Sequence, residues 1–375
     1  MARSAYKIAL LPGDGIGPEV VGSAVEVLKQ VADQHSFDLI FTTYDYSAAS
    51  YAKTGKSITP VDMDRIGDSS DAILLGAMGI LDIRLPDGRE IAPQIDLRDH
   101  FSLFASLRHT QLFPGVPTRL KASNIDILVI RETTEGMFAG RSDSYDESKA
   151  NIELSDRMTI TRVTCEKLFR LSFEQARLRA SKRKSSNSSD AYCRREAKVT
   201  LLHKSNVLRS NSLLVRTFYD ICKEYPDVTA ADAYIDAGAM YFITKPEDYD
   251  VVVTENLMGD IVSEVAAGIV GGLGVAPSAD LSETKGVFQP CHGSAPDIAG
   301  KGVANPTATW LSAAMMLDWI GLQKRDNTLI DAAETLRTAI RELLAQGPKT
   351  RDIGGTAGTR EVTVALLKLL ANPPR

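Results

Sequence analysis

The feature that most constrains the fold of this chain is the alternation of two apolar patterns along its length. Short β-branched or apolar runs are typical of buried strands, and apolar residues repeated every three to four positions are typical of helices that bury one face. The expected strands are Lys7–Leu11, Phe37–Tyr44, Ala72–Leu75, Ile125–Ile130, Val199–Leu202 and Val251–Val253. The expected helices are Pro18–Ala32, Ser155–Leu178, Ala304–Ile320 and Leu329–Leu344. This order favours an α/β fold with a largely parallel sheet, and a length of 375 residues favours about two domains.

The charge and composition exclude several classes of partner. A net charge of −5 argues against nucleic acid as the main ligand, and no apolar run reaches the ~18 residues that a membrane span needs. The polar start, Met1–Lys7, leads directly into a strand, so no signal peptide is expected. The cysteines form no CxxC pair and are expected to be free thiols in a reducing, cytoplasmic compartment. They are Cys165, Cys193, Cys222 and Cys291.

Two segments interrupt the alternation. Gly140–Leu154 is polar and irregular, and is interpreted as an arm that extends from the body of the protein. Arg177–Glu196 is basic and rich in Ser and Asn. It is expected to be a solvated helix end that runs into a mobile loop, and nucleic-acid binding is the less favoured alternative.

The strand at Val251–Val253 is followed by a pair of carboxylates, Asp260 and Glu264. They stand four residues apart where a helical pattern begins, so both side chains project from one face of the helix. Such a pair suits Mg²⁺ or Mn²⁺, which prefer hard oxygen ligands. From the spacing alone, a solvated acidic face explains the pair equally well.

A glycine-rich turn, Leu11–Glu19, follows the first expected strand and is here called the glycine turn. The Rossmann fingerprint G-x-G-x-x-G is not met, because Gly13 and Gly15 match but position 18 is proline. What the pattern still predicts is a tight loop whose backbone closely approaches another group at a helix N-terminus.

Polar side chains near other strand ends are candidates for a binding site. Arg131 lies at the end of a strand, and with Arg98 and Arg108 it could hold a di- or tricarboxylate through paired hydrogen bonds. Three separate surface ion pairs are the alternative. Lys204 also follows a strand and could act as a general base if its pKa is lowered, and Asp236 is a further candidate metal ligand or proton-relay partner.

The loop from position 289 to 306 is dense in Gly, Pro, His, Asp and Asn, and precedes a helix. Its glycines permit close approach of a ligand to the backbone. Asp297 could accept hydrogen bonds from two ribose hydroxyls, as an acidic residue does in nicotinamide-binding sites.

Taken in order, six motifs resemble those of the β-decarboxylating dehydrogenases, which include isopropylmalate, isocitrate, homoisocitrate, tartrate and D-malate dehydrogenases. The resemblance runs from about Lys7 to Gly321. It rests on LPGDGIGPE, LRDHFSLFASLR, VIRETTEG, HKSNV, VTENLMGDIVSE and HGSAPDIAGKGVANPTA. It implies an isopropylmalate dehydrogenase-like two-domain α/β fold that is not a Rossmann fold. It also implies a clasped homodimer whose subunits share their active sites.

The resemblance also implies roles for individual residues. Arg98, Arg108 and Arg131 would hold the carboxylates of a malate-type substrate. Lys204, which would help to take the hydroxyl proton, and Asp236 would reach in from the partner subunit. Asp236, Asp260 and Glu264 would bind Mg²⁺ or Mn²⁺. The adenosine half of the cofactor would lie against His292, Gly293, Ser294, Ala295, Asp297, Ile298 and Asn305.

The same resemblance implies the cofactor and the domain boundaries. Asp297 followed by Ile298 is similar to the NAD-using members, and an anionic Asp297 would repel the 2′-phosphate of NADP. Residues 1–103 and 271–375 would form the cofactor domain. Residues 104–270 would form the domain with the substrate, metal and dimer contacts.

Two positions depart from the family pattern. Phe138 stands where the family usually has the tyrosine that protonates the enol, so either Tyr145, Tyr241 or a water replaces it, or the reaction stops at the keto acid. Gln94 stands where isopropylmalate enzymes have apolar residues. A buried amide against an isopropyl group would lack a hydrogen-bond partner, which favours a smaller or more polar side group, as in D-malate or tartrate.

The expected function is therefore NAD- and metal-dependent oxidation of a 2-hydroxy dicarboxylate to the 2-keto acid, with β-decarboxylation. The alternative is a catalytically impaired regulatory subunit of such a dehydrogenase, which the loss of tyrosine at Phe138 favours. Retention of the lysine, the carboxylates and the three arginines argues against that alternative.

Overall fold

The computed structural model describes residues 3–118, 120–121, 124–140, 152–185 and 195–372. The chain divides into two compact units. Unit 1 comprises Met1–Leu103, Gln111–Arg119 and Ala267–Arg375, and unit 2 comprises Phe104–Thr110 and Leu120–Ala266.

Unit 1 is built on five strands in the order β2-β1-β3-β10-β9. Their bounds are β1 Ala5–Gly13, β2 Asp38–Thr43, β3 Ala72–Ala77, β9 Pro277–Leu281 and β10 Gly286–Pro290. Four of them run parallel, and β9 pairs antiparallel with β10. The central strand β3 is buried along its whole length, as its apolar sequence predicts for a parallel strand covered on both faces.

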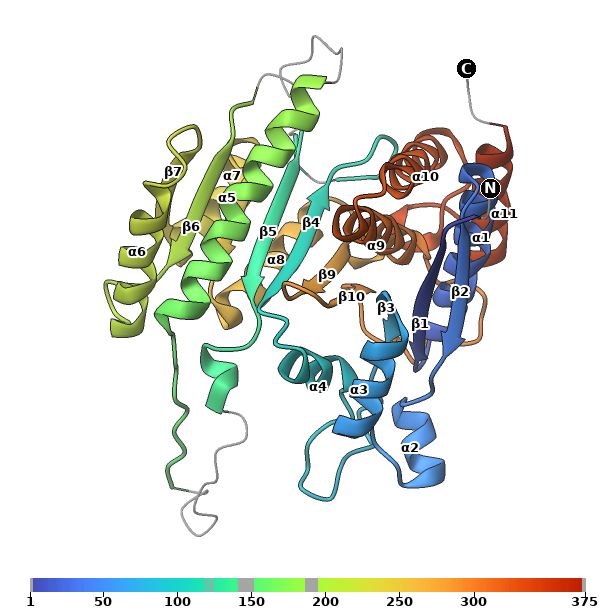
Figure 1. Ribbon diagram of the computed structural model, residues 1–375, viewed down its shortest axis with the longest axis horizontal. Coiled ribbons are helices and arrows are strands. Elements are labelled where there is room, and N and C mark those ends of the chain that lie inside the picture. The colour runs from blue at the N-terminus through green and yellow to red at the C-terminus, as the bar shows by residue number, and fades with distance from the viewer. Residues whose placement is uncertain (1–2, 119, 122–123, 141–151, 186–194, 373–375) are drawn as a thin grey trace. The chain divides into compact units, whose positions relative to one another are not determined.

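Helices lie on these strands and on one another in the described part of unit 1 (Figure 1). They are α1 Gly17–His35, α2 Ala48–Thr54, α3 Pro60–Ser69, α4 Pro93–His100, α9 Thr307–Lys324, α10 Asn327–Gln346 and α11 Thr359–Ala371. Helix α9 packs on β9 and β10 and is almost entirely buried, with Trp310 fully enclosed. Its apolar residues surround the whole helix, which is the pattern of a core helix rather than an amphipathic one.

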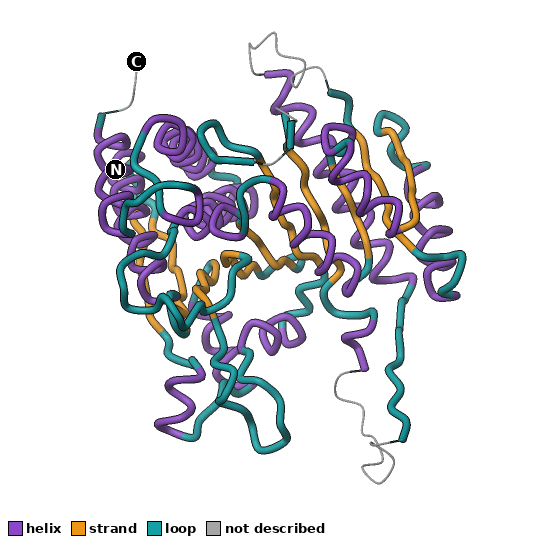
Figure 2. The backbone as a smooth tube through the Cα atoms, turned by 180° about the vertical axis from the view of Figure 1, so that it is seen from behind, coloured by secondary structure: helices purple, strands orange, loops and turns teal. Residues whose placement is uncertain are grey.

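Unit 2 has five strands in the order β4-β5-β8-β6-β7, and β5, β8, β6 and β7 are parallel. Their bounds are β4 Ala105–Gln111, β5 Asp126–Glu132, β6 Lys198–His203, β7 Thr229–Tyr234 and β8 Val251–Thr254. Helices α5 Arg162–Ser185 and α6 Arg209–Cys222 cover one face, and α7 Ile235–Thr244 and α8 Asn256–Ile269 lie on the other (Figures 1 and 2). The α/β class with mostly parallel strands is confirmed.

The long helix of unit 2 is displaced from its expected position. It spans Arg162–Ser185 instead of Ser155–Leu178. Its start is fixed by Thr161, whose hydroxyl accepts the amide of Thr164 at 3.4 Å, and by the carboxylate of Glu135, which accepts the Thr161 amide at 2.7 Å. These contacts satisfy amide groups at the helix N-terminus, and apolar periodicity alone could not locate them.

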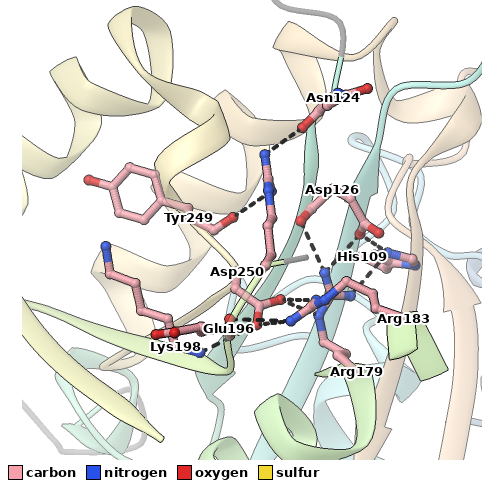
Figure 3. A network of polar contacts seen from close by, with 10 residues as sticks. His109, Asn124, Asp126, Arg179, Arg183, Glu196, Lys198, Tyr249 and Asp250 are labelled. Atoms are coloured by element: carbon pink, nitrogen blue, oxygen red, sulfur yellow. Dashed lines mark hydrogen bonds and ion pairs between the residues drawn. The ribbon is translucent and has the colours of Figure 1, made fainter. Parts of the chain in front are cut away.

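The C-terminal turns of α5 confirm the expected helix end, but two of its arginines are not solvated (Figure 3). Arg183 is buried and donates to both oxygens of the buried Asp250 at 2.8 Å. Arg179 donates to Asp250 at 2.8 Å and to Asp126 at 2.9 Å, and His109 lies 2.6 Å from Asp126. The two arginines therefore fasten α5 to the start of β5 and to the residue before β8. Residues 186–194 of this segment, and residues 141–151 of the expected arm, lie outside the described part of the chain.

Candidate active site

Most of the expected site residues of unit 2 lie at or just after the carboxyl ends of its parallel strands. Arg131 is the penultimate residue of β5, and Lys204 directly follows β6. Asp236 is the second residue of α7, after β7, and Asp260 lies in the first turns of α8 after β8. Parallel strands end at a common edge of their sheet, where ligands of open α/β sheets bind.

Lys204 and Asp236 form an ion pair, with the lysine Nζ 2.8 Å from a carboxylate oxygen. The hydrogen bond from Lys204 holds the pKa of Asp236 below its usual range. The lysine backbone is fixed as well, because its amide donates to Asn211 Oδ1 at 2.8 Å. The ring of Tyr234 lies 5.9 Å from Nζ. Sequence-based placement of Lys204 at a strand end is confirmed, and its direct partner is Asp236 of the same chain.

Arg131 is almost completely buried, with 2% of its surface exposed. Its guanidinium donates to Asn256 Oδ1 at 2.7 and 3.0 Å, and it pairs with the carboxylate of Asp260. The ring of Phe138 packs 5.3 Å from the guanidinium carbon. Gly259 permits this arrangement, because a Cβ there would lie 2.7 Å from the arginine Cγ. Arg131 therefore supplies a positive charge beside Asp260.

The start of α8 is held by residues that the sequence-based site did not include. The Glu255 carboxylate accepts the amides of Leu257 and Met258 at 3.1 and 2.8 Å, and burial raises its pKa. Asn256, besides binding Arg131, donates to the carbonyl of Glu135 at 3.0 Å. The polar turn before the helical pattern, with an acid able to cap backbone amides, was the signal that could have identified them.

Glu264 follows Asp260 by one turn of α8 and lies in the field of two arginines. Partial burial raises the pKa of Glu264, and the positive charge of Arg108 lowers it. The negative charge of Asp260 raises this pKa further, and the positive charge of Arg131 lowers it, both with smaller effects. Arg108 itself is buried, and its Nε donates to Ser106 Oγ at 3.1 Å. Unit 2 thus gathers two arginines and two carboxylates of the expected set.

Asp236, the third expected metal ligand, does not lie with Asp260 and Glu264 among the described residues. In the part of the chain that the structure describes, no three His, Cys, Asp or Glu side chains are close enough together to hold one metal ion. Asp260, which exposes 41% of its side chain, and Glu264 are hard oxygen donors one turn apart. The donor chemistry of that pair fits Mg²⁺ or Mn²⁺.

Arg98 and Gln94 belong to α4 in unit 1, four residues apart and on the same helix face. Arg98 is buried and donates through Nε to Asp280 at 2.8 Å, and Gln289 binds the same carboxylate oxygen at 3.0 Å. Asp280 was not expected from the sequence, which gives no local sign of a fully buried acid in β9. Gln94 Oε1 is buried and has no hydrogen-bond partner within the described residues.

The expected cofactor residues lie in one segment of unit 1, His292–Asn305, here called the cofactor segment. Burial lowers the pKa of His292, whose Nδ1 lies 3.0 Å from the carbonyl of Gly293. Its Nε2 is buried without a hydrogen-bond partner in the described chain. Ala295 adopts a left-handed conformation with φ of 42°. An unsatisfied ring nitrogen and a strained backbone in an otherwise ordered loop are consistent with a ligand-binding segment.

The other cofactor residues differ in their surroundings. Asp297 and Gly293 are exposed, whereas Ser294 and Ile298 are partly covered. Asn305 is buried, with its amide nitrogen 2.8 Å from Asp352 and its oxygen accepting the Thr307 amide at 3.0 Å. Asn305 therefore fixes the start of α9 in addition to any contact with a cofactor.

Comparison with known proteins identifies the class. A family model described as isocitrate/isopropylmalate dehydrogenase matches residues 7–366, and the chain belongs to that family. It is accordingly a decarboxylating oxidoreductase that acts on the CH–OH group of a hydroxy acid. No described helix is long and apolar enough to cross a membrane.

Individual relatives match over nearly their whole length. A 3-isopropylmalate/3-methylmalate dehydrogenase from Methanocaldococcus jannaschii is 40% identical over 366 residues, covering 97% of this chain and 98% of the relative. A 3-isopropylmalate dehydrogenase from Thermobifida fusca is 37% identical, covering 96% and 97%. The crystal structure of an isocitrate dehydrogenase from Methylococcus capsulatus superposes with a TM-score of 0.84 at 32% identity, covering 97% of this chain and 99% of that chain.

Proposed function

We propose that this chain catalyses the NAD- and Mg²⁺- or Mn²⁺-dependent oxidation of a malate-type 2-hydroxy dicarboxylate to the 2-keto acid, with loss of the β-carboxylate as CO₂. The observation that carries the proposal is the arrangement of Arg108, Arg131, Asp260 and Glu264 in unit 2, where cations and metal-type carboxylates lie together. A substrate with two carboxylates and a hydroxyl next to one of them matches that charge pattern.

Different residues of the chain would bind the substrate and transfer its proton. Arg108 and Arg131 would hold substrate carboxylates, and Lys204 would accept the proton of the hydroxyl group while Asp236 orients the amine. When bound, the metal would lower the hydroxyl pKa and the nicotinamide would accept the hydride. Phe138 has no proton to give, so the proton that replaces CO₂ at the β-carbon comes from another donor. Tyr145, one of the expected donors, lies outside the described residues.

We also propose a homodimer in which Lys204 and Asp236 serve the site of the partner subunit. The faces of α7 and α8 support this, because they carry large exposed apolar side chains beside the candidate site. These are Met240 (51% exposed), Ile243 (52%), Leu257 (38%) and Ile261 (61%). A second copy of the chain would remove them from water and bring a third carboxylate, Asp236, to the metal pair.

Mixing two inactive variants tests the shared site. Lys204→Met and Asp260→Asn homodimers should both be inactive. After the subunits are exchanged, half of the dimers are mixed and each holds one intact site, so about a quarter of the wild-type activity should return. No recovery, with mixed dimers demonstrated by mass spectrometry, would show that each site uses residues of one chain only.

Gln94 is proposed to select the group at the β-carbon of the substrate. Its unpartnered Oε1 favours a substrate that donates a hydrogen bond, such as tartrate, or one that leaves room for water, such as D-malate. The names of the relatives favour 3-alkylmalates. Comparing kcat/KM for tartrate, D-malate and 3-isopropylmalate in the wild type and in Gln94→Leu decides between them.

The overall reaction is tested by measuring CO₂ against NADH with each of these acids, with and without divalent metal. Equal amounts of CO₂ and NADH, dependent on metal, are expected. NADH without CO₂ would limit the reaction to oxidation. Absence of turnover across the whole panel, with activation of an added homologous subunit, would favour the regulatory alternative.

A further inference from the structure

The glycine turn, Leu11–Glu19, contacts the backbone of the cofactor segment at Gly15. A Cβ on Gly15 would lie 1.9 Å from the carbonyl oxygen of Ser294, and Gly15 has φ of 58°. The amide of Ile16 donates to that same carbonyl at 2.9 Å. At Gly15 the turn therefore lies directly against the backbone of the cofactor segment.

An aspartate at the centre of the turn joins several loops of unit 1. Asp14 exposes only 2% of its surface. Its two carboxylate oxygens accept three backbone amides, from Ala48 at 2.9 Å, Ala49 at 2.9 Å and Gly79 at 3.0 Å. The carbonyl of Gly79 in turn accepts the hydroxyl of Ser294 at 2.6 Å. Gly79 therefore links the carboxylate of Asp14 to Ser294 of the cofactor segment.

A second acid of the same turn holds the other end of the cofactor segment. Glu19 Oε1 accepts the amide of Ala304 at 3.2 Å and also binds the hydroxyl of Thr359. Between the two ends, Ile16 and Val20 form a buried apolar cluster with Ala304. Ala295 and Ile298 of the cofactor segment pack against that cluster. The segment is therefore fixed at Ser294, at Ile298 and at Ala304 by the glycine turn and the first turns of α1.

From these contacts we propose that Asp14 and Glu19 are positioning residues that set the conformation of the adenosine site, and that the glycine turn acts as a clamp on the cofactor segment. This inference rests on the proposed role of that segment in NAD binding. Buried carboxylates that accept backbone amides fix loops more strongly than neutral groups, because charge-assisted hydrogen bonds are the stronger class. The clamp accounts for the glycine at position 15, where a side chain would overlap the carbonyl of Ser294.

The test compares dinucleotide binding and turnover in Asp14→Asn and in the control Glu26→Gln. Glu26 lies in α1, and its carboxylate pairs with the exposed Arg360. In Asp14→Asn, Kd and KM for NAD should rise by about tenfold or more, and Kd for AMP should rise by a similar factor. The kcat and the KM for the hydroxy acid should stay within about threefold, and Glu26→Gln should match the wild type on all five measures.

Two outcomes would overturn the clamp. One is unchanged affinity of Asp14→Asn for both NAD and AMP. The other is a loss for NAD without a loss for AMP, which would mean that the turn acts on the nicotinamide half. If Asp14→Asn does not fold, Glu19→Gln repeats the comparison at the other end of the segment.

One more variant separates failure of the clamp from failure of the proposed function. His292→Ala should weaken NAD binding if the cofactor segment is the adenosine site. A loss in His292→Ala with none in Asp14→Asn rejects the clamp alone. Unchanged NAD affinity in both variants, or no NAD binding by the wild type, rejects the proposed role of the segment and the clamp with it.

Discussion

Replacing Asp250 with asparagine tests the buried charge network that fastens α5 to the strands of unit 2 (Figure 3). Asp250 accepts two hydrogen bonds from Arg183 and one from Arg179, all at 2.8 Å. The side chains of Arg183 and Asp250 are only 3% and 4% exposed. An amide of the same shape keeps one acceptor and removes the negative charge that faces the buried guanidinium of Arg183.

The structure sets the size of the expected effect. Removing one partner of a buried ion pair costs about 3–5 kcal/mol, because the remaining charge stays out of water. For a unit of this size each kcal/mol lowers Tm by roughly 2–4 °C, so Asp250→Asn should lower the Tm of unit 2 by roughly 6–20 °C. Adding Arg183→Met should recover part of that loss, since the buried guanidinium that faced the Asp250 carboxylate is then absent.

Thermal and urea unfolding followed by circular dichroism measure these changes. Asp248→Asn is the matched control, because Asp248 is exposed two residues away, and it should change stability by no more than about 0.5 kcal/mol. A loss below about 1 kcal/mol in Asp250→Asn would mean that the network is screened like a surface pair, and the reasoning would be wrong.

The pH dependence gives an independent check of the same pair. Burial alone would raise the pKa of Asp250, but the hydrogen bond and charge of Arg183 and the charge of Arg179 outweigh it and hold the pKa below its usual value. The folded state therefore binds this proton less readily than the unfolded state. The stabilisation is complete above the unfolded pKa and is lost as pH falls through the folded pKa. The difference between wild type and Asp250→Asn should shrink below about pH 4.

Three further predictions concern other sites. Asp297→Ser removes an exposed negative charge from the cofactor segment and should raise kcat/KM for NADP relative to NAD by about tenfold; an unchanged ratio would exclude Asp297 as the discriminating residue. Gly259→Ala places a methyl group 2.7 Å from Arg131 Cγ and should lower kcat/KM for the hydroxy acid by about tenfold or more, whereas Gly268→Ala, at an open position of the same helix, should not. Burial raises the pKa of Glu132 to about 6, so the folded protein binds this proton more readily than the unfolded chain. The contribution of Glu132 to the free energy of unfolding should therefore increase as pH falls from about 6 towards 4.5. In urea unfolding, a Glu132→Gln protein should lack that increase.

Local sequence was sufficient to predict those features that depend only on neighbouring residues, such as strand burial and the helix face on which a side chain lies. The β-branched run of β8 is buried on both faces, and Lys204, Arg131 and Asp260 lie near strand ends as expected. The spacing of Asp260 and Glu264 placed both on one face of α8 because helix geometry depends only on residue number. Family resemblance in ordered motifs supplied the fold class and the reaction class.

Contacts between residues distant in the sequence decided the rest. Arg183 was expected in solvent, yet it is buried against Asp250, 67 residues away. Arg98 faces Asp280, and no local pattern distinguishes that buried acid from a surface one. Both cases follow from desolvation, since the cost of burying a charge depends on which partner the fold brings to it.

The glycine turn shows most clearly which features the local sequence determines and which depend on tertiary contacts. Its sequence determined a tight turn at the start of α1 and a close approach to some other group, because only glycine tolerates those backbone angles without a side chain in the way. The tertiary structure decided that the group is the carbonyl of Ser294 in the cofactor segment. Backbone conformation is set locally, but the identity of the neighbour depends on how segments almost 280 residues apart pack within unit 1, and that is encoded by the whole chain.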